Sequence, residues 1–164
     1  MSTVLVMSHI DMVREHVAAF TRQDWAAYKA HLLPDSTYEE MATSRRLTGP
    51  EEIVEGLKPW MTAFPDLRPT FTSVIESGNE VAAEITWEGT HTGPLALPSG
   101  VIPASGKRGM VHGAMVWLFE GDRIRNTRHY FELMELFGQL GVTPDKAMAM
   151  AEPMAAAKQG AAPS

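Results

Sequence analysis

The sequence predicts an α+β fold, in which helices precede an antiparallel meander of strands. Two observations indicate this class. Apolar residues recur at helical spacing up to about residue 64, and from residue 70 onward they alternate as in strands that hairpin-length turns connect. The 164 residues suffice for one domain, 1–164, and show no internal repeat. We therefore expect a strongly curved antiparallel sheet with the N-terminal helices packed on its concave side, around an apolar pocket.

Two helices are expected near the N-terminus. Ser8 can cap the first, with Asp11 at the acidic position of a capping box. The apolar residues that share one face of this helix are Ile10, Val13, Val17 and Phe20. Asp24 can cap a short second helix over residues 25–31, which Pro34 is expected to end.

A short strand over residues 36–41 is expected to lead towards a third helix. Gly49-Pro50 marks the start of that helix, because proline suits the first helical position and the two glutamates that follow favour a helix N-terminus. Pro59 lies inside the helical pattern, so we expect a kink or a break there.

The rest of the chain is mostly β. Four strands are expected, at residues 70–76, 80–90, 107–120 and 123–131. Residues 93–106 contain three prolines and three glycines, which predicts a loop. A helix over residues 132–140, a C-terminal helix over 146–158 and a flexible tail to residue 164 complete the order.

Composition excludes several classes of function. The chain has no cysteine, which rules out disulfides, thiolate zinc sites and cysteine nucleophiles. Its net charge is −6 and its basic residues are scattered, so nucleic acid and membranes are poor partners. No apolar stretch reaches the about 18 residues of a membrane span, and no signal peptide is visible, which predicts a cytoplasmic protein. The histidines and acidic residues show no metal-binding spacing.

Three motifs occur in a fixed order within residues 31–141. They are AFPDLR at residues 63–68, GTHTGP at residues 89–94, and FEGDRI at residues 119–124 with QLG at residues 139–141. Together they resemble the SnoaL-like polyketide cyclases, or ester cyclases, of the nuclear transport factor 2-like superfamily. The resemblance implies a cone-shaped fold, a homodimer or homotetramer, and no cofactor. It also implies a hydrophobic small-molecule substrate, on which the best-known members perform intramolecular aldol chemistry.

The resemblance places the family's catalytic aspartate, at the end of the last strand, at Glu132, whose side chain is one methylene longer. A carboxylate in an apolar pocket has its pKa raised by desolvation, which suits a base that removes an acidic C–H proton. Alternation along the last strand puts Asn126, Arg128, Tyr130 and Glu132 on one face. Arg128 could then stabilise an enolate, and Tyr130 could donate a hydrogen bond.

Two alternatives stay open for this strand. Arg128 and Glu132 could form a structural ion pair at a solvated rim. The pocket could also face the other set of residues on the strand, which is Arg125, Thr127, His129 and Phe131.

Further candidates lie on other elements. His91 shares the parity of the apolar face of residues 80–90 and could act as an acid or base, or could instead cap the local hairpin. His112 could contact the substrate or be a hydrogen-bonded core histidine. The aromatic residues expected to contact a flat hydrophobic ligand are Trp60, Phe64, Trp87 and Trp117. His31, beside Tyr38 and two glutamates, reads as part of a solvated face.

These features support three hypotheses of function. The first is a cofactor-independent enzyme with acid/base chemistry on a carbonyl-bearing or polycyclic molecule, either a cyclase or an isomerase. The second is a hydrolase similar to the epoxide hydrolases of this superfamily, for which Arg128 and Glu132 are the motivating pair. The third is a binding or dimerisation module without catalysis.

Overall fold

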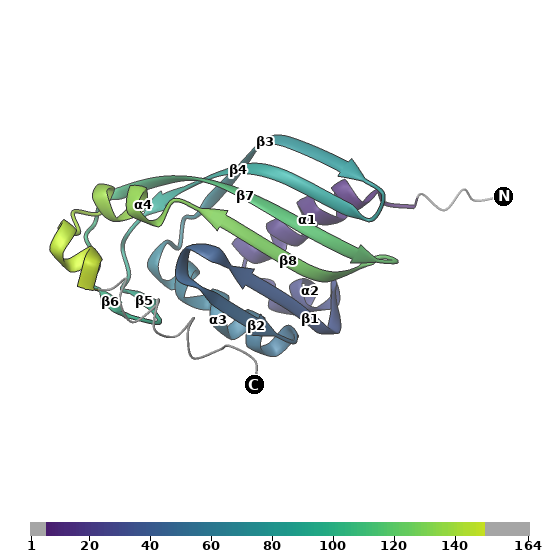
Figure 1. The fold of residues 1–164 in the computed structure, drawn as a ribbon, viewed down its shortest axis with the longest axis horizontal. Coiled ribbons are helices and arrows are strands. Elements are labelled where there is room, and N and C mark those ends of the chain that lie inside the picture. Colours follow the sequence, from purple (N-terminus) through teal and green to yellow (C-terminus); the bar gives the residue numbers. More distant parts are fainter. Residues whose placement is uncertain (1–5, 150–164) are drawn as a thin grey trace.

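In the computed structural model, which describes residues 6–149, a six-stranded sheet curls around the N-terminal helices (Figure 1). The strands across the sheet, in spatial order, are β2 (Arg45–Thr48), β1 (Leu32–Glu40), β8 (Arg123–Phe131), β7 (Arg108–Glu120), β4 (Glu80–Thr90) and β3 (Arg68–Ser77). The helices are α1 (His9–Thr21), α2 (Trp25–Ala30), α3 (Pro50–Ala63) and α4 (Leu133–Gln139), with a 3-10 turn at Met41–Thr43. The α+β class and the strongly curved sheet predicted from the sequence are confirmed, and the sheet does not close into a barrel.

Local signals in the sequence set the first two helices. The Ser8 hydroxyl accepts a hydrogen bond from the Asp11 backbone N–H at 3.1 Å, and the Asp24 carboxylate accepts one from the Ala27 N–H at 3.1 Å. These caps satisfy backbone donors that have no partner within the helix. The expected apolar face of α1 is the face that packs against β3 and β4.

Proline has less effect on the fold than predicted. Helix α2 already ends at Ala30, and Pro34 lies within β1 instead. There the pairing of β1 with β8 shifts between Leu32 and Thr37, so the missing N–H of Pro34 breaks no ladder bond. Pro59 does not break α3, which continues through it from Pro50 to Ala63.

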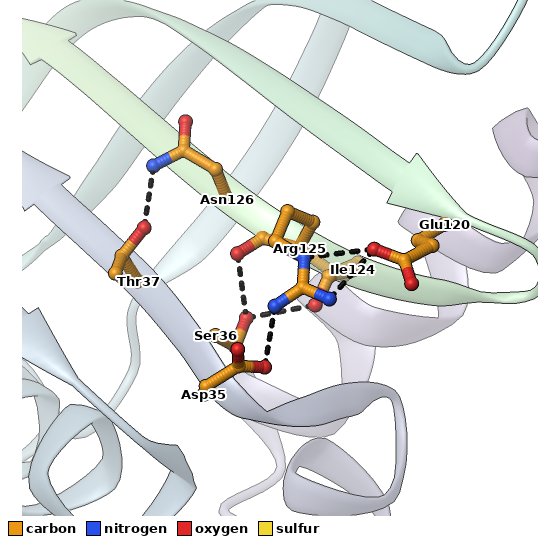
Figure 2. A network of polar contacts seen from close by, with 7 residues as sticks. All are labelled: Asp35, Ser36, Thr37, Glu120, Ile124, Arg125 and Asn126. Atoms are coloured by element: carbon orange, nitrogen blue, oxygen red, sulfur yellow. Dashed lines mark hydrogen bonds and ion pairs between the residues drawn. The ribbon is translucent and has the colours of Figure 1, made fainter.

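The sheet is mixed rather than wholly antiparallel, because β1 runs parallel to β8. Side-chain hydrogen bonds and ion pairs join the start of β1 to β8 (Figure 2). The Ser36 hydroxyl donates to the Ile124 carbonyl at 2.8 Å, and the Arg125 guanidinium joins Glu120 to Asp35. The pairing sets Glu40 opposite His129 in the β1–β8 register.

One region is more ordered than the sequence predicted, and one expected helix is described only in part. Residues 93–106, predicted as a loop, contain the hairpin of β5 (Leu95–Leu97) and β6 (Gly100–Ile102). This hairpin buries three side chains, and α4 covers the same end of the molecule (Figure 1). Residues 144–149 are helical, and the rest of the expected C-terminal helix and tail lies outside the described residues.

The core has two parts. The larger lies between the concave face of the sheet and helices α1, α2 and α3. The smaller joins the end of α3 to the β5–β6 hairpin and α4. Within residues 6–149, no helix is both long and apolar enough to cross a membrane.

Candidate functional site

An apolar cavity lies inside the larger core. Its empty volume is about 630 Å³, counting the solvent at its mouth. Side chains from α1, α2, α3 and strands β1, β4, β7 and β8 line it, with Leu136 of α4. Most of the lining is aliphatic or aromatic. The polar atoms belong to a small set of residues, which are His16, Tyr28, Tyr38, Glu40, Trp60, Trp87, Trp117 and His129.

His129 is held by one ring nitrogen and leaves the other without a partner. Its Nδ1 lies 2.9 Å from the Tyr38 hydroxyl, and its Nε2 is buried with no hydrogen-bond partner. A Cβ added to Gly113 would point to the inner face of β7 and lie 3.4 Å from this Nε2 atom. The glycine therefore lets the backbone of β7 pass close to this nitrogen. His129 is one of the residues that line the cavity, and its Nε2 atom is buried in the cavity wall.

The environment keeps this imidazole neutral. Desolvation lowers the pKa of His129 to about 3, and desolvation raises the pKa of Tyr38 well above its usual value. Tyr38 is therefore protonated, and its O–H donates to Nδ1 of His129, the one partner of that hydroxyl among the described residues. A neutral ring with an accepting Nδ1 carries its hydrogen on Nε2. We thus assign His129, a residue of the cavity wall, an Nε2–H donor that no described residue accepts.

Glu40 is a buried carboxylate in the cavity wall. It is 1% exposed and accepts hydrogen bonds from Arg45 Nη2 at 3.0 Å, from Trp60 Nε1 at 3.0 Å and from the Thr43 hydroxyl. Arg45 supplies the counter-charge that a buried carboxylate requires. Glu40 therefore fixes the Trp60 indole, and its oxygens are already committed.

His16 repeats the pattern of His129 on the helical wall. Its Nδ1 lies 3.1 Å from Nδ1 of His31, and its ring stacks on Tyr28 with centroids 3.9 Å apart. Its Nε2 is buried and has no partner. Burial lowers the pKa of His16 well below its usual value, and the nearby His31 adds to this effect.

Four buried polar atoms of cavity-lining residues thus lack a partner within residues 6–149. They are Nε2 of His16, Nε2 of His129, Nε1 of Trp87 and Nε1 of Trp117. Leaving a buried donor or acceptor unpaired costs about 1–3 kcal/mol. A ligand that supplies polar atoms at these positions would recover that cost.

Of the alternatives for the last strand, the structure supports the one in which the pocket faces the set that includes Thr127, His129 and Phe131. Thr127, His129 and Phe131 face inward, whereas Asn126 bonds to Thr37 at 2.8 Å on the other side (Figure 2). Alternation failed here because of a β-bulge. Asn126 pairs with Leu118 and Ile124 pairs with Phe119, which leaves Arg125 as an extra residue. One extra residue exchanges the two faces of every position beyond it.

The candidates beyond the bulge therefore do not line the cavity. Arg128 donates to the Asn126 amide oxygen at 3.2 Å, and Tyr130 is 45% exposed. Glu132 precedes α4 and lines a separate, open depression on the outer face, together with Tyr130 and His112. No ion pair joins Arg128 to Glu132 within the described part of the chain.

His91 and His112 also lie outside the cavity. His91 is buried, but its Nδ1 accepts the Ser105 backbone N–H at 3.2 Å and its ring stacks on Phe64 in the smaller core. This is the local capping role left open above. His112 is exposed and bonds to Glu135 at 3.1 Å, so it is neither a core histidine nor part of the cavity wall.

The four aromatic candidates lie in two different parts of the core. Trp60, Trp87 and Trp117 line the cavity, whereas Phe64 is buried in the smaller core. Sequence reasoning assigned Tyr38 and Glu40 to a solvated face, which was wrong because both are buried in the cavity wall, and it missed His16. A helical signal for His16 was present, because it lies three residues after Val13 on the buried face of α1. Among residues 6–149, no three His, Cys, Asp or Glu side chains form a group that could hold a metal ion.

Comparison with known proteins connects this cavity to one family. A family model described as SnoaL-like polyketide cyclase matches residues 10–140. No curated protein matches the sequence. Among solved structures, a SnoaL-like candidate polyketide cyclase from Jannaschia sp. superposes with a TM-score of 0.74 at 15% identity, covering 88% of this chain and 99% of the other.

Two further structures superpose with slightly lower TM-scores. IdmH from Streptomyces antibioticus, a candidate polyketide cyclase, gives a TM-score of 0.71 at 18% identity, covering 83% of this chain and 100% of the other. TsrD from Streptomyces laurentii gives 0.70 at 25% identity, covering 85% and 99%.

Proposed function

The chain belongs to the SnoaL-like polyketide cyclase family, and on that premise we propose that it is a cofactor-independent enzyme for acid/base chemistry on a hydrophobic, carbonyl-bearing or polycyclic small molecule. The reaction class is that of an aldol cyclase or an isomerase, in which an enolate forms and then attacks a carbonyl or is reprotonated. The neutral His129 imidazole, fixed by Tyr38 in an apolar cavity, is the observation that carries the proposal.

Forming an enolate requires a donor at the carbonyl oxygen, where negative charge develops. A neutral imidazole N–H can serve as that donor, because the oxygen becomes a stronger acceptor as the reaction proceeds. His129 carries its hydrogen on Nε2, and Tyr38 holds the ring in this tautomer. Because the donor is oriented before the substrate binds, no reorganisation is needed at the transition state.

The aromatic wall suits a flat ligand. Trp60 meets Phe131 edge to face with centroids 5.6 Å apart, and Glu40 fixes the Trp60 indole. The Trp87 ring lies 5.9 Å from that of His129, so a bound ring system and its carbonyl would meet both. The unpaired indole N–H of Trp87 offers a second donor to a substrate oxygen.

The proposal assigns no catalytic role to Glu132, which faces the outer depression, and makes His129 the hydrogen-bond donor to the carbonyl oxygen. It also makes an epoxide-hydrolase-like reaction less suited to this site. Glu40 is the carboxylate that lines the cavity, and its hydrogen bonds leave it poorly placed to activate a water. The homodimer or homotetramer expected from the sequence stays a prediction, which light scattering would check.

Deuterium exchange into 2-tetralone, a flat bicyclic ketone with acidic C–H groups, would test the proposal. The protein in D₂O is expected to accelerate the loss of these protons in NMR spectra. His129→Phe is expected to lower the rate by about 100-fold, the lower end for one positioned acid or base group. His129→Gln, which keeps an N–H donor, is expected to retain part of it. Binding without exchange would favour a non-catalytic binding module.

A further inference from the structure

We propose that His16 and His31 act together as the general base of the cavity, with His16 taking a proton from the ligand while passing its own proton to His31. This inference rests on the proposed function, because it supplies the base that an enolising enzyme needs. His129 cannot fill that role in the tautomer that Tyr38 imposes, since its Nε2 already carries a hydrogen.

The rings of His16 and His31 are in direct contact. Their Nδ1 atoms are 3.1 Å apart, a hydrogen-bond distance, so one nitrogen carries a hydrogen and the other accepts it. When His16 is the donor, its Nε2 holds a lone pair. That Nε2 is a buried atom of a cavity-lining residue and has no partner among the described residues, so no protein group uses its lone pair, which is left for a C–H proton of a ligand.

The step balances within the pair. A C–H bond next to the carbonyl breaks, its electron pair becomes the enolate, and an N–H bond forms at Nε2 of His16. In the same step the hydrogen on Nδ1 of His16 moves to Nδ1 of His31, whose Nε2 already carries a hydrogen. His16 stays neutral, and the positive charge resides on His31.

Placing the charge on His31 is physically necessary. His16 is 2% exposed, and an imidazolium there would be desolvated. His31 is half-buried, at the end of α2, where it can meet water. The charged groups around it are Glu15, Arg22 and Asp24, of which the two carboxylates favour its protonated form. The relay thus carries charge from the apolar cavity to the surface.

The relay also provides a route for the proton afterwards. It can return through His16 to a different carbon of the ligand, which is isomerisation, or leave from Nε2 of His31 to water. The second route predicts that protons taken from the ligand exchange with solvent.

The first test reads the protons directly. Long-range ¹H–¹⁵N NMR spectra of the intact protein are expected to show His16 protonated on Nδ1 and unprotonated on Nε2. Protonation of His16 on Nε2, with His31 as the donor, would overturn the inference, and this result does not depend on any variant.

The second test uses 2-tetralone exchange in D₂O. His16→Phe, which keeps the stack on Tyr28, is expected to lower the rate by about 100-fold. His31→Gln can still accept the Nδ1 hydrogen of His16 but cannot take the proton over, so the rate should fall with the fold intact. His9→Gln on the same helix is the matched control, because Gln keeps a donor for the Gly121 carbonyl that His9 contacts.

The pH profile separates a relay from a structural role. In the wild-type protein the rate is expected to rise with pH as His31 loses its proton and then to level off. Desolvation lowers the pKa of His31, so this rise lies below its usual value of about 6.5. His31→Gln should lose the rise, whereas a merely structural effect would lower the rate and leave the rise in place.

The outcomes distinguish the two proposals. If His129→Phe abolishes exchange while His16→Phe and His31→Gln match the wild-type protein, the relay is wrong and the proposed function stands. If the wild-type protein does not accelerate exchange at all, both proposals are wrong.

Discussion

Removing the Tyr38 hydroxyl should expose how strongly the cavity depends on one hydrogen bond. Tyr38→Phe deletes the oxygen that donates to Nδ1 of His129 and leaves that nitrogen without a partner. Tyr38 is 4% exposed, so water does not readily replace its hydroxyl. An unsatisfied buried acceptor costs about 1–3 kcal/mol, and Tyr38→Phe is expected to lower the free energy of unfolding by this amount.

The companion variant sharpens the prediction. His129→Phe leaves the Tyr38 hydroxyl unpaired and should cost a similar amount. The double variant replaces both partners by apolar groups of similar shape, which can be nearly neutral. Its loss of stability should therefore be smaller than the sum of the two single losses, with a coupling free energy of about 1–2 kcal/mol.

Urea unfolding, followed by circular dichroism and by tryptophan fluorescence, would measure all four proteins. Coincident transitions would license a two-state analysis, and equal slopes would show that the denatured states are comparable. Additive losses, within about 0.5 kcal/mol, would refute the reasoning, because residues without a shared interaction behave that way.

Other perturbations have equally definite outcomes. Folding lowers the pKa of His129 to about 3, so as the pH falls below about 6.5 the unfolded chain binds a proton that the folded chain does not. The free energy of unfolding should therefore fall, by up to about 2 kcal/mol at pH 5. In urea titrations, the stability of His129→Phe should depend less steeply on pH than that of the wild-type protein. Gly113→Ala should cost about 1–3 kcal/mol and slow 2-tetralone exchange, since its Cβ would lie 2.9 Å from the Tyr130 carbonyl oxygen and beside Nε2 of His129. Glu132→Gln should exchange 2-tetralone protons at the wild-type rate, whereas His129→Phe should not. If Glu132→Gln lost the activity and His129→Phe kept it, Glu132 would be the catalytic group.

Local features of the fold could be predicted from the sequence. The caps at Ser8 and Asp24 and the alternation in residues 80–90 depend on neighbours within a few positions, and the structure has them as expected. The limits of β4 and β8 match the prediction to the residue.

Features that depend on distant pairing could not be predicted. The bulge at Arg125 arises where β8 pairs with β7, and nothing in the strand's own sequence marks it. Without the bulge, the alternation rule selects Asn126 and Arg128 as pocket residues; with it, His129 faces inward. The parallel partner β1 joins from about 90 residues upstream, since Tyr38 and His129 are 91 positions apart. Tyr38 and Glu40 enter the site only through this pairing.

That parallel pairing has a consequence for biosynthesis. At about 5–20 residues per second, a ribosome makes Tyr38 roughly 5–18 s before it makes His129. During that interval β3, β4 and β7 are also made, and β3 and β4 pack on α1, but β1 still lacks β8, the strand that joins it to the rest of the sheet. Closing so long a loop is also slow, because its entropy is lost before the contacts form. The cavity wall that Tyr38 and His129 form together is therefore completed only after β8 has been made and has paired with β1.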